Sequence, residues 1–163
     1  MSVGMKRSKY PVLMSNSDIY IEYFENDGKI EGPYKIYFEN GKLWKICNYI
    51  NGKLNGECKI YFMSEKVYIS YNYFNGNIHG EYKKYYNDGE LNEICHYINN
   101  KKHGESKTYY KNGQLHIISN YNNNNLHGKY KIYSENGKIY KKCYYINNKK
   151  TKKIYYKIYS LSH

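Results

Sequence analysis

The sequence repeats itself with a period of 24 residues, and this period constrains the fold more than any other feature. Three registers of glycine keep it: Gly32, Gly56, Gly80, Gly104 and Gly128; Gly41, Gly89, Gly113 and Gly137, with Glu65 in the remaining place; and Gly28, Gly52 and Gly76, followed by Asn100, Asn124 and Asn148. Two registers of tyrosine have the same spacing: Tyr37, Tyr61, Tyr85, Tyr109 and Tyr133, and Tyr49, Tyr73, Tyr97, Tyr121 and Tyr145. Chance does not keep five registers over five copies, so the chain is an array of about five short repeats.

Each repeat has the pattern of a β-hairpin. Asn-Gly or Asp-Gly pairs stand at 40–41, 88–89, 112–113 and 136–137, between segments rich in Tyr, Ile and Phe. Such pairs favour two-residue type I′ turns, because both central residues need a positive φ. The second junction, Asn51 to Gly56 in the first repeat, predicts a longer turn with glycine at both ends. The predicted structural turn residues are Gly32, Gly41, Gly52, Gly56, Gly76, Gly80, Gly89, Gly104, Gly113, Gly128 and Gly137.

The segments between these turns predict the strands. Strand pairs are expected near 33–39 and 42–50, 57–63 and 66–74, 81–87 and 90–98, 105–111 and 114–122, and 129–135 and 138–146. An opening strand near 18–25, whose register within the repeat stays open, and a last strand near 153–159 complete the set. The predicted fold is all-β: an elongated single-layer antiparallel β-meander of consecutive hairpins. A lone hairpin is marginally stable in water, so stacked neighbours must stabilise each unit.

The composition supports strands rather than helices. The chain has 25 Tyr and no Ala, and Tyr and Ile favour strands. Lys, Asn, Ile and Tyr are also the residues of AT-rich codons, which indicates a low-GC source. No apolar run approaches the length of a membrane-spanning helix, and no secretory signal follows the basic residues Lys6 and Arg7. We therefore expect a cytoplasmic protein, in the host cytoplasm if the source is a virus.

The cysteines do not predict a metal site. Cys47, Cys95 and Cys143 are 48 residues apart, which is two repeats. Four strands at ~4.8 Å separate them too far for a disulfide or a shared metal. Cys47 and Cys58 flank one turn and could pair across it. Without a secretory signal, free thiols are nevertheless the expectation.

Nothing in the sequence predicts catalysis. His79, His103 and His127 would stand ~10 Å apart, too far to share a metal, and are interpreted as turn-flanking residues. His96 and His116 lie in different registers and form no evident pair. No nucleophile–base motif, phosphate-binding glycine loop or carboxylate pair occurs. We expect no catalytic residue, no cofactor, no metal and no small-molecule substrate.

The repeating unit resembles the MORN repeat, in particular the shorter-consensus variant of many bacterial and giant-virus proteins. The motifs that carry the resemblance are G-x-Y-K-I-Y from Gly32 to Tyr37, the stretch from Gly80 to Leu91, and the His-Gly pairs at 79–80, 103–104 and 127–128. The resemblance covers about residues 28–150. It implies an elongated antiparallel β-meander that acts as a scaffold or binding surface, and relatives have been linked to membranes, dimerisation and protein partners.

The repeat divides the chain into three parts. Residues 1–17 are interpreted as an N-terminal tail, 18–159 as a single MORN-like repeat domain, and 160–163 as a C-terminal tail. The units lie near 32–55, 56–79, 80–103, 104–127 and 128–151, with partial strands at the ends.

One combination of registers indicates a candidate binding face on this basic chain of net charge +12. In every repeat a lysine stands two residues before a tyrosine: Lys35 and Tyr37, Lys59 and Tyr61, Lys83 and Tyr85, Lys107 and Tyr109, Lys131 and Tyr133. Strand alternation places both on one face, as a stripe of ammonium groups and phenol rings. Such a stripe is either an anion-binding surface or a solvated face that opposes edge aggregation.

The leading hypothesis is a non-enzymatic repeat scaffold that presents this Tyr- and Lys-rich surface to a protein partner. The alternative is electrostatic binding to an anionic membrane or a nucleic acid. A third reading, an antitoxin-like role, rests on the resemblance alone. The open terminal strands could also pair with a second copy or a partner strand.

Overall fold

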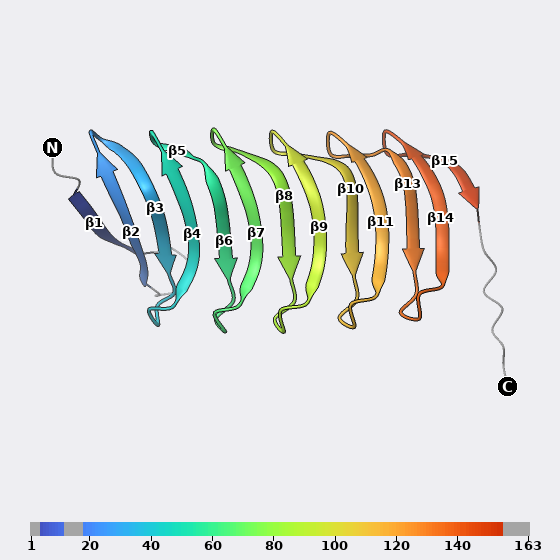
Figure 1. The fold of residues 1–163 in the computed structure, drawn as a ribbon, viewed down its shortest axis with the longest axis horizontal. Helices are drawn as coiled ribbons and strands as arrows, with labels where there is room; N and C mark the ends of the chain where they lie inside the picture. Colours follow the sequence, from blue (N-terminus) through green and yellow to red (C-terminus); the bar gives the residue numbers. More distant parts are fainter. Residues whose placement is uncertain (1–3, 12–17, 155–163) are drawn as a thin grey trace.

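The computed structural model describes residues 4–11 and 18–154, and every regular element within them is a β-strand. The strands form one antiparallel sheet in which spatial order follows the sequence (Figure 1). They are β1 (Gly4–Pro11), β2 (Asp18–Asn26), β3 (Lys29–Tyr37), β4 (Leu43–Ile50), β5 (Lys53–Leu54), β6 (Gly56–Tyr61), β7 (Val67–Phe74), β8 (Asn77–Tyr85), β9 (Leu91–Ile98), β10 (Lys101–Tyr109), β11 (Leu115–Asn122), β12 (Asn125–Leu126), β13 (Gly128–Tyr133), β14 (Ile139–Ile146) and β15 (Lys149–Ile154). The predicted β-meander of consecutive hairpins is confirmed.

Two-residue turns line one edge of the sheet, the upper edge in Figure 1. Asn51 and Gly52 have φ values of 52° and 73°, and both residues also have a positive φ in the turns at 27–28, 75–76, 99–100, 123–124 and 147–148. Positive φ at both positions is the type I′ signature. The prediction of a longer turn at this junction is wrong, because the strand resumes at once: Lys53 pairs with Ile50.

Three-residue loops line the opposite edge, where type I′ turns were predicted. The amide of Gly41 donates to the carbonyl of Phe38 (2.9 Å), and the amide of Phe38 donates to the carbonyl of Lys42 (2.8 Å). Gly41 has a φ of 80°, but Asn40 is not left-handed, so this prediction is wrong. The reason is local: the Oδ1 of Asn40 accepts a hydrogen bond from the amide of Lys42 (3.1 Å), which leaves only the glycine left-handed.

The glycines of the register that begins at Gly32 lie within or at the start of strands, not in turns. Their φ values run from 75° to 114°. Beside Gly32 the pairing of β2 with β3 shifts, because Tyr23 pairs with Tyr34 whereas Phe24 pairs with Glu31. A left-handed glycine at such a shift marks a β-bulge. These glycines therefore bend the strands rather than close the hairpins.

The two ends of the sheet extend the prediction. No strand is predicted before residue 18, yet β1 pairs with β2, with Gly4 opposite Glu25 and Pro11 opposite Asp18. Because β2 leads into a two-residue turn, it has the register of the second strand of each repeat, which the sequence left open. At the other end β15 ends at Ile154, and the rest of the predicted strand near 153–159 lies outside the described residues, as does the predicted tail 160–163.

The core is a single row of side chains that crosses the hairpins on one face, which we call the packed face. It begins with the cross-strand pair of Tyr34 and Cys47. The buried residues of the described chain all lie in this row: Cys47, Cys58, Tyr71, Cys95, Ser106, Ser119 and Cys143. One or two tyrosine rings follow each group of small side chains along the row, and the rings of Tyr71 and Tyr82 stack with centroids 6.1 Å apart. Each large ring therefore covers smaller neighbours on adjacent strands.

A disulfide joins Cys47 and Cys58 across β4 and β6, with their Cα atoms 4.2 Å apart. The expectation of free thiols is wrong for this pair. Both cysteines belong to the packed row and occupy neighbouring strands, so their side chains face each other. Cys95 and Cys143 are free and buried.

From Gly52 onward, each two-residue turn is bound to the repeat that precedes it. The amide of Asn100 donates to the carbonyl of Ile78 (2.9 Å), and the amide of Ile78 donates to the Oδ1 of Asn100 (2.7 Å). The same side-chain bond joins Lys102 to Asn124 and Leu126 to Asn148. Asn tolerates a positive φ, so its replacement of Gly in the later turns adds a contact between repeats at little conformational cost.

Candidate functional site

The five Lys–Tyr pairs lie on the face opposite the packed face, which we call the lysine face. Its central row alternates lysines with the residues paired to them: Lys35, Ile46, Lys59, Ser70, Lys83, Ile94, Lys107, Ile118, Lys131 and Lys142. In the first repeat, Lys35 and the hydroxyl of Tyr37 both donate to Glu22, each over 3.2 Å. The sheet thus brings the predicted residues together, one pair per hairpin.

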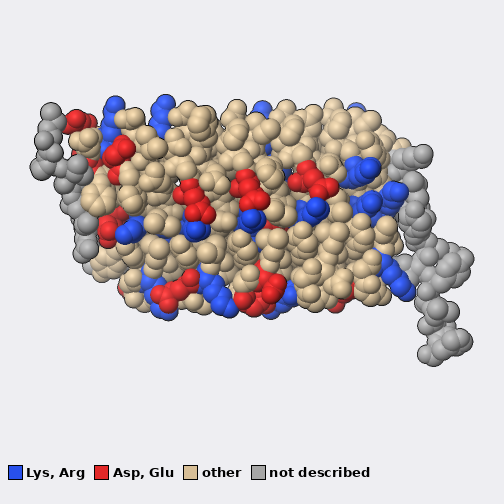
Figure 2. All heavy atoms as spheres, in the orientation of Figure 1, with Lys and Arg blue, Asp and Glu red and all other residues tan. Residues whose placement is uncertain are grey.

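Carboxylates neutralise four of these five lysines. The ion pairs are Lys35–Glu22 (3.2 Å), Lys59–Glu57 (2.8 Å), Lys83–Glu81 (2.5 Å) and Lys107–Glu105 (2.8 Å). The hydrogen bond that each lysine donates to its carboxylate raises the pKa of that lysine. Figure 2 shows the carboxylates as a row beside the basic row. The stripe is therefore not the run of free ammonium groups that the lysine register alone suggests. In three repeats a Glu two residues before the Lys shares its face, and in the first repeat Glu22 lies opposite Lys35 on the neighbouring strand.

The last repeat departs from this pattern. Lys129 stands where the three preceding repeats have Glu, and Lys142 lies opposite Lys131 where they have Ile or Ser. Within residues 20–151, whose side chains are described, no carboxylate forms an ion pair with these three lysines. In Figure 2 the row of carboxylates stops before the C-terminal side, where basic groups continue.

The charge of the whole chain follows the same division. Residues 128–163 contain ten Lys and one Glu, a net charge of +9. Residues 1–127 contain 16 basic and 13 acidic residues, a net charge of +3. Most of the net charge of +12 therefore belongs to the C-terminal end and not to the array as a whole.

A row of exposed apolar side chains follows the two-residue turns on the lysine face. We call it the apolar ridge, and its members are Ile50 (46% exposed), Phe74 (58%), Ile98 (43%) and Ile146 (46%). Each is the last residue before a turn, and Asn26 and Asn122 occupy the other two places of this register. Across the turns, Ile50, Ile98 and Ile146 pair with exposed lysines: Lys53, Lys101 and Lys149. At ~4.8 Å per strand the ridge is about 40 Å long.

A groove of about 470 Å³ on the lysine face brings together three histidines, His79, His96 and His103. His96 and His103 are cross-strand partners, a pair that the sequence did not reveal. In the part of the chain that the structure describes, no group of three or more His, Cys, Asp or Glu is placed to hold a metal.

Burial raises the pKa of the Cys95 thiol to about 11, which makes it a poor nucleophile at neutral pH. Nor does any described helix have the length and hydropathy to cross a bilayer.

Comparison with known families identifies the repeat. The sequence model of the MORN repeat variant matches residues 30–51, 78–99, 102–123 and 126–147, more than half of the chain. The chain belongs to the MORN repeat variant family. MORN repeats are generally interaction or scaffold modules, and the extended polar face with one exposed apolar side chain in most repeats agrees with such a role.

Comparison with other proteins adds little to the MORN assignment. A search of curated proteins finds no match. Among solved structures, a crystal structure of a GtfA/B complex bound to UDP and GlcNAc is similar at 13% identity over 80% of this chain, with a TM-score of 0.32. The MORN chain spans only 24% of the length of that protein.

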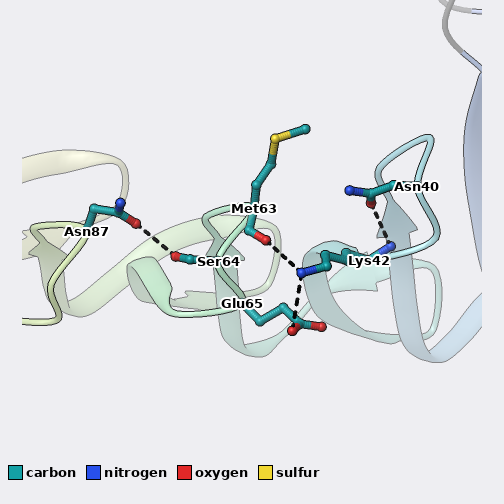
Figure 3. A network of polar contacts seen from close by, with 6 residues as sticks. All are labelled: Asn40, Lys42, Met63, Ser64, Glu65 and Asn87. Carbon is teal, nitrogen blue, oxygen red and sulfur yellow. Dashed lines mark hydrogen bonds and ion pairs between the residues drawn. The ribbon is translucent and has the colours of Figure 1, made fainter.

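The MORN repeat between the first two matched segments, near residues 54–75, has the same hairpin but an unusual loop. The loop is Met63-Ser64-Glu65, and Glu65 takes the left-handed position with a φ of 66°. Neighbouring repeats hold it (Figure 3): Lys42 donates to the carbonyl of Met63 (3.2 Å) and lies 3.5 Å from the Glu65 carboxylate. On the other side Ser64 donates to the Oδ1 of Asn87 (2.8 Å). Contacts between repeats thus replace the missing glycine.

Sequence reasoning missed the apolar ridge and the basic last MORN repeat. Both signals were present in the sequence. The ridge residues share one 24-residue register, and the charge imbalance appears when acidic and basic residues are counted repeat by repeat. What was missing was the exposure of the ridge side chains and the ion pairing of the earlier lysines, because both depend on neighbouring strands.

Proposed function

We propose that the chain is a non-enzymatic MORN scaffold that docks a protein partner along the apolar ridge. The observation that carries the proposal is the exposure of four large apolar side chains, 43% to 58%, in one line on one face. A row of exposed apolar side chains favours burial against a partner, because its removal from water is favourable. The proposed docking surface therefore lies beside the two-residue turns and not on the ion-paired Lys–Tyr stripe, which the sequence predicted as the binding face.

The chemistry beside the ridge indicates an acidic partner. Lys53, Lys101 and Lys149 lie directly across the turns from ridge residues, and within the described residues no carboxylate pairs with them. Consecutive ridge positions stand two strands apart, ~10 Å. An α-helix advances about 10.5 Å in seven residues. An amphipathic helix with one apolar residue every seven and acidic residues beside it therefore matches the spacing of the ridge.

The test compares ridge and off-ridge variants in affinity purification with cross-linking from the source cells. Phe74→Ser with Ile98→Ser removes the centre of the ridge. Met63→Ser is the matched control, because Met63 is 62% exposed but lies in a loop away from the ridge. We expect one set of acidic proteins to be captured by the unchanged chain and by the control, and lost with the ridge variant.

Direct binding of a captured protein then decides the proposal. With purified components, the ridge variant should weaken binding at least tenfold, roughly the effect of losing one or two anchor side chains. Equal affinity for the ridge variant and the unchanged chain would contradict docking along the ridge and move the site to another surface.

A further inference from the structure

The groove of about 470 Å³ on the lysine face joins the centre of the apolar ridge, and we call it the histidine groove. Its three imidazoles, His79, His96 and His103, come from the consecutive strands β8, β9 and β10. The ridge residue Ile98 lines the same groove. The ring of His79 also lies 6.1 Å from that of Phe74, the preceding ridge residue. A partner that covers the centre of the ridge therefore also covers this groove.

The two exposed imidazoles of the groove, those of His79 and His96, take places where the preceding repeat has asparagine. Asn55 stands in the register of His79, and Asn72 in that of His96. Asparagine offers a hydrogen-bond donor and an acceptor, as neutral imidazole does, but it does not titrate. The histidines therefore give this part of the surface a charge that changes with pH.

The other charged groups that face the groove keep their charge near neutral pH. From β8 and β10 they are Lys101 and the two ion pairs Glu81–Lys83 and Glu105–Lys107. Each ion pair is neutral as a whole. On the flanking strands, β7 has no Lys, Arg, Asp, Glu or His, and β11 has only His116, which packs on Tyr110 at the loop edge. Protonation of the imidazoles thus adds positive charge beside Lys101, where an acidic partner would neutralise it.

On the premise of docking along the apolar ridge, we propose that the histidine groove makes the affinity for the acidic helix depend on pH. Protonated His79 and His96 bind carboxylates that stand beside the apolar residues of the helix. Imidazole gains its charge between about pH 8 and pH 5, a range in which Asp, Glu and Lys keep theirs. Because the bound carboxylates favour the protonated imidazoles, the helix binds more tightly as the pH falls through this range and less tightly as it rises.

The dimensions of the surface agree with this arrangement. His96 precedes Ile98 by two residues on β9, which is about 6.6 Å along the strand. A helix with its side chains is about 10–12 Å across. A helix seated on Ile98 therefore reaches His96 on one side and Lys101, directly opposite Ile98, on the other.

The test measures the fluorescence anisotropy of a labelled synthetic peptide with the full chain between about pH 5.5 and pH 8. The probe has four heptads, each with one Leu and with Glu at the two flanking positions of the helix. Its Kd should fall about fivefold or more from pH 7.5 to pH 5.5, since each exposed imidazolium–carboxylate pair tightens binding about two- to fivefold. With Gln in place of Glu in the peptide, the Kd should change less than about twofold.

A histidine variant assigns the pH dependence to the groove. His79→Asn with His96→Asn introduces the residues of the preceding repeat at both places. This variant should bind the Glu peptide like the unchanged chain at pH 7.5 and lose the gain at pH 5.5. His116→Asn removes a histidine at the opposite edge of the sheet and is the control, which should keep the gain. Circular dichroism at both pH values checks that each variant keeps the fold.

Three results would overturn the proposal: a Kd that does not change with pH, the full gain in the double histidine variant, and an equal gain with the Gln peptide. Each of them leaves docking along the ridge intact. Phe74→Ser with Ile98→Ser tests the ridge separately, because it should weaken binding at every pH. Failure of the Glu peptide to bind at any pH would contradict the ridge as a surface for an acidic helix, and this proposal with it.

Discussion

The two faces of the sheet contain the same ion pair in different surroundings. On the packed face, Lys102 and Glu93 are 2.5 Å apart, and their side chains are 17% and 21% exposed. On the lysine face, Lys83 and Glu81 are also 2.5 Å apart, but their side chains are 33% and 42% exposed. Solvent screens the second pair, whereas removal of one partner of the first leaves a half-buried charge. Burial, and not contact distance, therefore decides how much each pair matters.

The ion pair of Lys102 and Glu93 on the packed face replaces an apolar contact. In the preceding repeat the places of Glu93 and Lys102 hold Ile69 and Ile78, which pack on the core. Burial lowers the pKa of Lys102, but the hydrogen bond with Glu93 and nearby charges outweigh it, and the pKa is raised overall. A repeat array tolerates this exchange because each unit contacts only its neighbours.

Alkaline pH tests the packed face as a whole and has the largest expected effect. Burial raises the pKa of Tyr82 to about 12 and also raises those of Tyr49, Tyr71, Tyr97 and Tyr130. A raised pKa in the folded state stabilises below the unfolded value of about 10, and this stability is lost as pH rises through the folded value. We expect unfolding between about pH 10 and 12, followed by circular dichroism and tyrosinate absorbance. A sheet that stays folded with every tyrosine ionised would contradict a desolvated packed row.

The disulfide is the next largest contribution of the packed face. Cys47→Ser with Cys58→Ser should lower the free energy of unfolding by about 3 kcal/mol, because the bond restrains a short loop in the unfolded chain. Urea titration measures the loss, and addition of reductant should destabilise the unchanged chain but not the variant. Cys95→Ser, at a free buried thiol, is the control: it keeps the disulfide, so reductant should destabilise it as much as the unchanged chain.

Substitution of one partner compares the two ion pairs directly. Lys102→Leu alone should cost about 2 kcal/mol, because it leaves Glu93 half-buried without its cation. Lys102→Leu with Glu93→Ile introduces the apolar types of the two adjoining repeats and should recover most of that loss. Urea midpoints of both variants measure it, and a double variant as unstable as the single one would show that the pair is more than a substitute for apolar packing.

The edge of the sheet that carries the three-residue loops belongs to neither face. A substitution there should raise the free energy of unfolding, by an intermediate amount, whereas the others lower it. Glu65→Gly should raise the free energy of unfolding by about 1 kcal/mol, because only glycine adopts a positive φ without steric cost. The gain remains after loss of the exposed contact with Lys42, since such surface pairs contribute little. A fall in thermal stability would show that the contacts in Figure 3 outweigh the backbone strain.

The smallest effect is expected on the lysine face. Lys83→Ala should change the free energy of unfolding by less than about 1 kcal/mol, and the change should shrink as salt rises, because its pair with Glu81 is exposed. Thermal melts at low and high salt measure it. An effect as large as that of Lys102→Leu would remove the distinction between the faces.

The 24-residue period by itself determined the architecture. Turn-forming pairs and strand-forming segments recur at fixed intervals, so consecutive antiparallel hairpins, their number and the face of each lysine follow from local chemistry. The strand β1 was missed because residues 4–11 lie outside the repeat and carry none of its registers. The type of each turn was also misread, because Asn-Gly suits both a type I′ turn and a three-residue loop.

Only the tertiary structure decided the interactions between repeats. Whether Lys35 is free depends on Glu22, 13 residues away, and whether Cys47 is oxidised depends on Cys58 lying opposite it on the next strand. The exposure of the apolar ridge and the uncompensated charge at Lys131 likewise depend on neighbours across the sheet. The period specifies which residues share a register, but burial and charge compensation arise only when strands that are distant in sequence lie side by side.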